Sequence, residues 1–453
     1  MMKAKNLIKR VTIGILAVVL STSVVWADDN PGLIQRAKDA CKNATYDIPT
    51  VTNDIDGWPQ GPAIMCDSAV VMEAESGEVL YNKAMDERRY PASTTKIMTA
   101  LVALEHSNLT DTVTFTAEGL KEAVPGNSYV TPVIQEGETL TMEQCLYAIM
   151  LVSGNEVSTQ VAMQVGGSVE GFVEMMNEKA QEIGCKDTHF VNANGLHDEN
   201  HYTTAHDLAM IAQEAYKNEE FRKIVGSRYY TIPATNKTAE ERVLANHHAL
   251  LGEGDWHYDG CLGGKTGYTD TALNTLVTYF EKDGTVYICV VLHYKGTEVF
   301  TDTVMLAEYT KEFEKLQVSQ KKYTLSGGTA VVPKGTTTDA LEIQNTQNED
   351  GNEQETFLFN GYEVGQAVVD KKAYEADKKA EEAQKEEESK EEQSQNNEAQ
   401  SGSFSTFEMA VVVLVGLIGL GLILIVISVI KKKKRNDKQV RRWQKEKLNG
   451  AEC

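Results

Sequence analysis

The sequence predicts an α+β fold, in which an antiparallel sheet is flanked by helices and followed by a small all-β domain. Strand-like segments occur at both ends of residues 62–316, whereas the middle of this region shows helical periodicity. Strands from the two ends are expected to form one antiparallel sheet, against which the helices pack. A third observation, the uncharged stretch from Met409 to Ile430, predicts a membrane-spanning helix after these domains.

Composition and charge exclude several classes of protein. The chain has 453 residues, of which 42% are hydrophobic, so it can bury a large core and is not disordered throughout. Its formal net charge of −22 argues against a nucleic-acid-binding protein, which needs a basic surface. Residues 1–27 carry a net charge of +4 and residues 431–453 one of +7, so the stretch between them carries −33. This asymmetry indicates a chain that crosses a membrane.

The first 27 residues have the pattern of a signal peptide. A basic start precedes an apolar run from Val11 to Val25, and Ala27 is expected to be the last residue removed. The alternative is an uncleaved anchor, for which the apolar run is short. Residues 28–61 are polar and irregular, and we expect them to form a leader to the first domain.

Residues 62–316 begin with two strands and then become helical. Residues 68–72 and 77–81 read as a hairpin, and a helix is expected from Ser93 to His106. Further helices are expected at 142–152, 157–165, 169–183 and 208–216, the last opened by a capping box at residues 204–207. Strands return at 276–280 and 286–292, and a closing helix is expected at 301–316.

Three segments of different character follow. Residues 317–370 are rich in turns and short β-prone runs, which predicts a small β-rich domain. Residues 371–406 hold many Glu and Lys but too few apolar side chains for a core, so we expect a charged tether. Residues 407–430 are the expected transmembrane helix. The basic tail 431–453 then stays in the cytoplasm, so that all preceding residues lie outside the cytoplasmic membrane.

The cysteines and histidines show no convincing metal site. No CxxC pair occurs among the seven cysteines, and their wide spacing does not resemble a disulfide scaffold, although a bridge between Cys41 and Cys66 is one option. His197 and His201 have a spacing that can bind zinc on a helix. The Gly and acidic residues around them favour a loop instead, so no metal or cofactor is expected.

Ser93 and Lys96 form an SxxK motif at the expected start of a helix. A lysine three residues after a serine lies one turn away on the same helix face, where its amine can accept the hydroxyl proton. Lys96 must be neutral for this step, and burial beside another cation would lower its pKa accordingly. The helix N-terminus also favours the negative charge that develops during attack. We therefore predict a serine nucleophile with a lysine base.

A second motif, Ser153-Gly154-Asn155, stands at the break between two expected helices. Its hydroxyl can relay a proton between the lysine base and a leaving amine, and its amide can hold a substrate carbonyl. The SxN spacing recurs at Ser394 in the tether, where no pocket is expected. The spacing alone does not make either copy a candidate. The first copy is one because it lies at a break between two expected helices.

The third motif is Lys265-Thr266-Gly267, followed by Tyr268. It precedes strand-rich sequence and is a candidate edge strand. Lysine and threonine there can bind a substrate carboxylate, while glycine leaves room for a substrate backbone to pair with the strand. SxxK recurs at Ser319, so no single motif is specific, but the ordered trio is the signature of serine penicillin-binding proteins and β-lactamases.

Residues 62–316 resemble the D-alanyl-D-alanine carboxypeptidases of serine peptidase family S11, the low-molecular-mass penicillin-binding proteins. The resemblance implies a serine β-lactamase/transpeptidase-like domain, and residues 317–370 resemble the second domain of that family. It implies no cofactor and no nucleic-acid partner. The stretches that carry it are Ser68–Tyr81, Pro91–Leu101, Ser153–Asn155, His201–Ala205, Asp207–Ala209 and Gly264–Thr269.

The family resemblance also implies roles for individual residues. Catalysis would proceed through an acyl-enzyme on Ser93, with Lys96 as base and Ser153 as proton relay. The activity implied is removal of the terminal D-alanine from peptidoglycan pentapeptides, in cell-wall synthesis and cell shape, with β-lactams as covalent inhibitors. Substrate binding would involve Asn155, Lys265, Thr266, Gly267 and Tyr268, with Lys265 and Thr266 at the terminal carboxylate and the backbone N–H groups of Ser93 and Tyr268 as oxyanion hole.

Departures from the family pattern leave alternatives open. Ala193 and Asn194 stand where the family often has Pro-His, which puts the deacylation rate in question, and Leu273 replaces a more usual Gly. A β-lactamase is one alternative, but it needs fast water attack, often through a dedicated Glu that no local pattern supplies. A catalytically silent penicillin- or wall-binding protein is the other, and the complete set of motifs argues against it.

Overall fold

The structure is a computed structural model that describes residues 30–370, except 46, 297, 320–322 and 349–350, together with 372–373, 375–376 and 379. The chain divides into two compact units, residues 1–371 and 372–453. The expected signal peptide, transmembrane helix and basic tail lie outside the described residues, as does nearly all of the expected tether. Among the helices that are described, none is long and apolar enough to cross a membrane.

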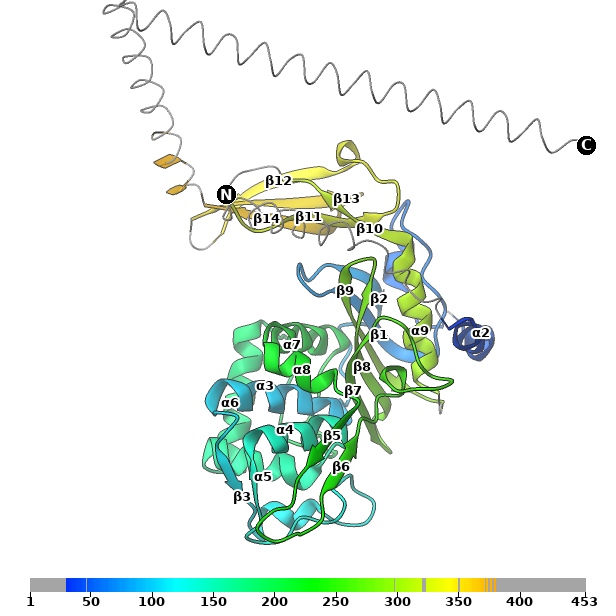
Figure 1. Ribbon diagram of the computed structural model, residues 1–453. Helices are drawn as coiled ribbons and strands as arrows, with labels where there is room; N and C mark the ends of the chain where they lie inside the picture. Colours follow the sequence, from blue (N-terminus) through cyan, green and yellow to red (C-terminus); the bar gives the residue numbers. More distant parts are fainter. Residues whose placement is uncertain are drawn as a thin grey trace, which may run out of the picture. The chain divides into compact units, whose positions relative to one another are not determined.

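A five-stranded antiparallel sheet forms the centre of the first unit (Figure 1). Its order is β2-β1-β9-β8-β7, so that β7 lies at one edge. The strands come from the two ends of the region, as the sequence predicts: β1 (Cys66–Glu73), β2 (Val79–Lys83), β7 (Cys261–Thr269), β8 (Leu273–Lys282) and β9 (Thr285–Tyr294).

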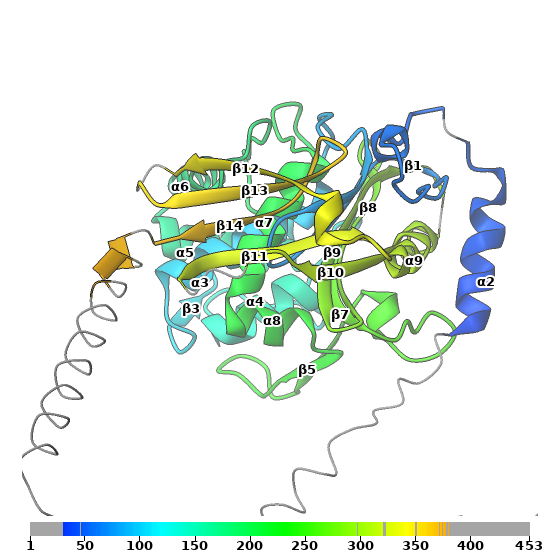
Figure 2. The same ribbon diagram turned by 90° about the horizontal axis from the view of Figure 1, so that it is seen from above.

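Helices cover both faces of this sheet because its strands bury side chains on both sides. In β1, Val70 and Met72 join the core beneath the main group of helices, while Ala69 and Val71 belong to the core on the opposite face. The first group consists of α3 (Lys96–His106), α4 (Met142–Leu151), α5 (Asn155–Gly166), α6 (Val169–Ile183), α7 (Ala205–Lys217) and α8 (Glu219–Val225). The opposite face carries α9 (Phe300–Tyr309) and α2 (Pro31–Ala40), which lie side by side in Figure 2.

Two short hairpins border the helical group. One pairs β3 (Thr112–Thr114) with β4 (Thr139–Thr141), and the other pairs β5 (Tyr229–Ile232) with β6 (Arg242–Ala245). A fully buried ion pair of 2.8 Å between Arg242 and Glu138 connects the two hairpin regions. The sequence pattern predicts none of these strands, since three or four residues are too few to show alternation.

The expected leader is wrong in part, because much of residues 28–61 is folded onto the first unit. Pro31 at the first helical position and the Asn30 cap start α2, whose Leu33 and Ala37 are buried. Trp58 is buried as well, and its indole donates to the carbonyl of Leu80 at 3.1 Å.

The closing helix is also shorter than predicted. It ends at Tyr309, and after a 3₁₀ turn the chain continues as β10 (Phe313–Gln317), which pairs with β11 (Thr324–Pro333) in a second antiparallel sheet. The expected domain boundary after residue 316 therefore cuts through this strand. Phe313 packs against Trp58 with ring centroids 5.0 Å apart, and this contact from the distant N-terminal segment favours the strand.

The second sheet has the order β10-β11-β14-β13-β12 and accounts for the expected β-rich segment. Besides β10 and β11 it contains β12 (Glu342–Gln347), β13 (Glu353–Phe359) and β14 (Tyr362–Val369). Every residue of β12 is exposed, so its sequence lacks the alternation that would predict a strand. Tyr362 of β14 packs on Trp58 and donates to the carbonyl of Val79 at 2.9 Å.

The optional disulfide between Cys41 and Cys66 is absent, since both are free thiols. They instead surround the buried carboxylate of Asp302. The Cys41 thiol donates to Asp302 Oδ1 at 3.3 Å, and the backbone N–H of Cys66 donates to Oδ2 at 2.7 Å. Burial raises the pKa of the Cys66 thiol, so it stays protonated at neutral pH.

Candidate active site

Ser93 and Lys96 meet at the start of α3. Ser93 lies in a 3₁₀ turn, Ala92–Thr95, rather than in the α-helix itself, which begins at Lys96. In a 3₁₀ turn, residues three apart project from the same side. Lys96 Nζ accordingly lies 3.0 Å from Ser93 Oγ. Ser93 stays partly exposed while Lys96 is completely buried, so a ligand can reach the hydroxyl but not the amine behind it.

Two further acceptors hold the amine of Lys96. Its Nζ donates to Asn155 Oδ1 at 2.7 Å and to the backbone carbonyl of Asn194 at 2.5 Å. A neutral amine has two N–H groups and one lone pair, so these two acceptors take both hydrogens. In the structure Lys96 Nζ also donates to Ser93 Oγ. When the amine is neutral, the two other acceptors take its hydrogens, and the lone pair that faces Ser93 accepts the hydrogen of the serine hydroxyl. This is the arrangement that a general base requires.

Burial lowers the pKa of Lys96 well below its usual value, and the nearby Lys265 lowers it further. Both causes agree with the expectation from the sequence. Burial also lowers the pKa of Lys265, to about 7. Glu156 opposes the shift of Lys96, and burial raises the pKa of Glu156 itself. Sequence reasoning missed Glu156, although its place directly after the SxN motif is a signal.

Ser153 occupies the break between α4 and α5, as predicted. Its φ of +60° places it in the left-handed region, a strained conformation for a residue with a side chain. The side chain is buried, yet Oγ has no hydrogen-bond partner among the described residues. A buried hydroxyl without a partner is costly, so this one is available to a ligand.

Asn155 begins α5 directly after this break. Its Oδ1 accepts from Lys96, which leaves Nδ2 as the group that can donate to a substrate carbonyl. The structure thus brings together the first two motifs, with Asn155 as the direct link between them.

The third motif lies on β7, at the edge of the sheet that faces the Ser93 turn. Lys265 is buried, and its Nζ donates to the carbonyl of Thr266 at 3.0 Å. Tyr268 is 58% exposed at the open edge. The expected edge strand is confirmed, and its free edge can pair with an extended peptide.

Gly267 serves a different purpose from the one the sequence suggests. A Cβ at this position would lie 2.8 Å from the backbone nitrogen of Ser93 and 2.3 Å from Thr275 Oγ1. Glycine is therefore required by the close approach of β7 to the nucleophile turn, on the protein side of the strand. Thr275 supports the same approach, because its hydroxyl donates to the carbonyl of Pro91 at 2.9 Å.

A loop at residues 190–202 closes the site from the other side. Its His201 accepts from the N–H of Val191 at Nδ1, which places the proton on Nε2, and this nitrogen lies 2.8 Å from Thr95 Oγ1. Burial lowers the pKa of His201 to about 3, so it is neutral and structural. Sequence reasoning missed this role, which no local pattern indicates. The described residues contain no cluster of three metal-ligating side chains.

The unusual residues of this loop act through their backbone. The carbonyl of Ala193 accepts from Thr99 Oγ1 at 2.6 Å, and that of Asn194 accepts from Lys96. Gly195 has φ of +83°, and a Cβ there would lie 1.9 Å from the carbonyl oxygen of Ala92. The contact with Lys96 thus does not depend on the side chain at position 194.

Leu273, the other departure from the family pattern, has φ of +56° as the first residue of β8. This is a conformation that glycine adopts without strain. The usual glycine of the family therefore fits this backbone position, and leucine occupies it at an energetic cost.

Comparisons with known proteins agree with this geometry. Residues 57–296 match the peptidase S11 family, described as D-alanyl-D-alanine carboxypeptidase. The carboxypeptidase DacF of Bacillus subtilis is 37% identical over 229 residues, which are 49% of this chain and 56% of DacF. A D-alanyl-D-alanine carboxypeptidase of Streptomyces sp. strain K15 is 33% identical over 51% of this chain and 81% of its own length.

Solved structures show the same similarity. The crystal structure of the Streptomyces K15 DD-transpeptidase superposes with a TM-score of 0.52 at 30% identity, covering 55% of this chain and 98% of that protein. Its fold therefore corresponds to the sheet and helices that carry the three motifs. The match of more than half of the chain places this protein in the peptidase S11 family.

Proposed function

We propose that this protein is a serine D-Ala-D-Ala carboxypeptidase that removes the terminal D-alanine from peptidoglycan pentapeptides. The observation that carries this proposal is the contact between the buried, pKa-lowered amine of Lys96 and Ser93 Oγ. Family membership supports it, and relatives described as D-alanyl-D-alanine carboxypeptidases share this part of the chain.

Acylation begins when Lys96 accepts the proton of the Ser93 hydroxyl and Oγ attacks the carbonyl of the penultimate D-alanine. The backbone N–H groups of Ser93 and Tyr268 stabilise the resulting oxyanion. When the tetrahedral intermediate collapses, the amine of the terminal D-alanine leaves and takes a proton from Lys96 through the Ser153 hydroxyl. The free Oγ of Ser153 supports this relay, because a proton carrier needs an uncommitted hydroxyl.

Deacylation repeats the same chemistry with water in place of the serine. Lys96, neutral again, removes a proton from water, which attacks the ester carbonyl. When this second tetrahedral intermediate collapses, Ser93 Oγ leaves and takes that proton back from Lys96. The terminal carboxylate of the pentapeptide binds beforehand at Lys265 and Thr266. That carboxylate favours protonated Lys265, whose pKa of about 7 in the free protein leaves it half-neutral at physiological pH.

The same proposal includes attachment to the cytoplasmic membrane with the enzyme domain outside. The pattern of residues 1–27 supports export, and the apolar stretch Met409–Ile430 followed by Lys431–Arg435 supports a C-terminal anchor. Substrate is the growing wall at the outer face, and β-lactams act as covalent inhibitors of Ser93.

The test uses the full chain in detergent with Nα,Nε-diacetyl-L-Lys-D-Ala-D-Ala, and mass spectrometry detects free D-alanine. Ser93→Ala should abolish release, while Ser319→Ala, at the second SxxK motif in the β-rich segment, should retain it. Rapid penicillin turnover without D-alanine release would identify a β-lactamase. Absence of both hydrolysis and acylation would identify a silent binding protein.

A further inference from the structure

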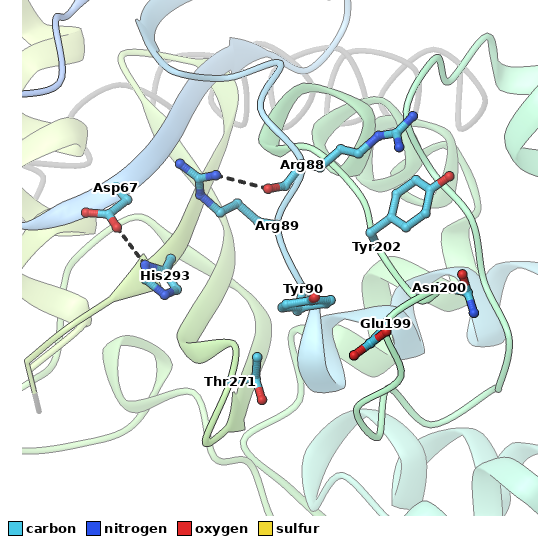
Figure 3. A pocket seen from close by; sticks show the side chains of 9 residues that line it. All are labelled: Asp67, Arg88, Arg89, Tyr90, Glu199, Asn200, Tyr202, Thr271 and His293. Carbon is cyan, nitrogen blue, oxygen red and sulfur yellow. Dashed lines mark hydrogen bonds and ion pairs between the residues drawn. The ribbon is translucent and has the colours of Figure 1, made fainter.

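A cavity of about 710 Å³ lies beside the nucleophile and has no part in the chemistry described above. Its walls come from the segment before Ser93, the loop at residues 199–202, the turn between β7 and β8, and the ends of β1 and β9 (Figure 3). Tyr90, three residues before Ser93, stands in the middle of the view, with Thr271 below it. The cavity therefore adjoins the catalytic residues through two short segments.

The proposed binding mode directs a substrate toward this cavity. With the carboxylate at Lys265 and the scissile carbonyl at Ser93 and Tyr268, the rest of the peptide runs along β7 toward its end at Thr269. An extended peptide advances about 3.3 Å per residue, so the residue before D-Ala-D-Ala lies about 7 Å from the terminal one. Thr271, two residues past the end of β7, lines the cavity, so a side chain at this position of the peptide is directed toward the cavity.

The charges around the cavity leave one carboxylate uncompensated. Glu199 has neither a hydrogen bond nor an ion pair within the part of the chain that the structure describes, and its carboxylate points toward the space between Tyr90 and Thr271 (Figure 3). The other charged side chains of the lining are paired: Arg88 with Asp187, Arg89 with Glu87, and Asp67 with His293 and Lys295. A cationic ligand group is therefore favoured at Glu199.

Other groups of the lining fit the remainder of an amine-bearing side chain. Tyr202 is held by the guanidinium of Arg88, 4.4 Å from its ring centroid, and with Tyr90 it offers aromatic surface to methylene groups. The Nε–H of Arg89 is buried and lacks an acceptor among the described residues. This N–H is a second group of the same wall that has no partner among the described residues, and it can donate to a carbonyl or carboxylate oxygen of the ligand.

We propose that this cavity is a specificity subsite for the residue that precedes D-Ala-D-Ala, and that Glu199 pairs with a free ammonium group on its side chain. The inference rests on the proposed function, since that function sets the direction of the peptide. The enzyme would then prefer stem peptides whose diamino acid has a free side-chain amine. It would disfavour stem peptides in which a cross-link has already acylated that amine.

The experiment compares two peptides that differ only at that amine, using the full chain in detergent. Nα-acetyl-L-Lys-D-Ala-D-Ala carries the free ammonium, and the Nα,Nε-diacetyl peptide lacks it. We expect wild type to have the higher kcat/KM for the free amine. Glu199→Gln should lower that value by about three- to fivefold, the size typical of an exposed ion pair, and leave the diacetyl peptide unchanged.

Glu174→Gln provides the matched control, because Glu174 is also exposed but lies on α6 and does not line the cavity. It should leave both peptides unaffected. Raising the ionic strength should reduce the wild-type preference, since salt screens exposed charges. Equal kcat/KM values for the two peptides in wild type, or an equal loss for both in Glu199→Gln, would overturn the subsite.

A binding measurement separates this inference from the proposed reaction. Calorimetry on Ser93→Ala, which cannot form the acyl-enzyme, reports the affinity of each peptide without turnover. Tighter binding of the free-amine peptide, removed by adding Glu199→Gln, supports the subsite even when wild type releases no D-alanine. Equal affinities overturn the subsite even when wild type hydrolyses both peptides.

Discussion

Replacing Gly267 with alanine tests how tightly β7 holds the nucleophile turn. The added Cβ would lie 2.8 Å from the backbone nitrogen of Ser93 and 3.1 Å from that of Thr94, whereas ordinary contacts begin near 3.4 Å. The turn or the strand must therefore move by at least about 0.6 Å. Displacements near 1 Å at reacting groups cost about 100-fold in rate, and overpacking costs about 1–3 kcal/mol of stability.

We therefore expect acylation of Gly267→Ala by a fluorescent penicillin to slow by roughly 100-fold, while the protein remains folded with a melting temperature lowered by a few degrees. Stopped-flow fluorescence measures the first quantity and differential scanning calorimetry the second. Adding Thr275→Ala removes the 2.3 Å contact with Oγ1 but not the contact with Ser93, so the rate should stay low.

Gly32→Ala is the control, because the only neighbour of a Cβ at that position is the Asn30 side chain at 3.4 Å. It should acylate at the wild-type rate. If Gly267→Ala also acylated within about threefold of wild type, the turn would be free to move without loss of function. Such a rate would show that β7 does not set the position of the Ser93 N–H.

The charges and hydrogen bonds of the site and of the buried pair between the two hairpins give three further predictions. Attack requires neutral Lys96, but carboxylate binding requires protonated Lys265, so kcat/KM should fall as pH rises through about 7. Lys265→Arg should move this fall in kcat/KM to higher pH, and an unchanged pH profile would show that the fall does not come from Lys265. His201→Gln should slow penicillin acylation about tenfold by loosening its loop, without changing the pH profile between 4 and 8, because its pKa of about 3 keeps it neutral there. Arg242→Met should destabilise the fold by about 3–5 kcal/mol in urea unfolding, whereas adding Glu138→Leu should recover much of the loss; additive effects would show that the buried pair does not interact.

The sequence pattern predicts correctly those elements that depend on residues close together in the sequence. The helix 169–183 is predicted with its observed bounds, because its amphipathic spacing and the Ser168 cap are both sequence-adjacent. The same holds for the SxxK pair, since three residues of separation place both side chains on one side of a turn. The break at Ser153 is likewise correctly placed between two helices.

Elements stabilised by distant partners were the ones missed. The pattern predicts the end of a helix where β10 lies, because its Phe313 is apolar in either form, and the contact that favours the strand comes from Trp58. The pattern predicts a leader where α2 lies, because the buried side chains of α2 are few and pack on α9, far along the chain. The exposed strand β12 has no apolar side at all and depends on pairing with β13.

The sequence alone determined the fold class, the three motifs and their order, because each depends on residue types at short spacing. Only the tertiary structure decided that Lys96 can act as a base. Its hydrogen-bond partners Asn155 and Asn194 lie 59 and 98 residues away along the chain, and Lys265 is farther still. A pKa depends on burial and on nearby charges, and both exist only after folding has brought these distant residues together.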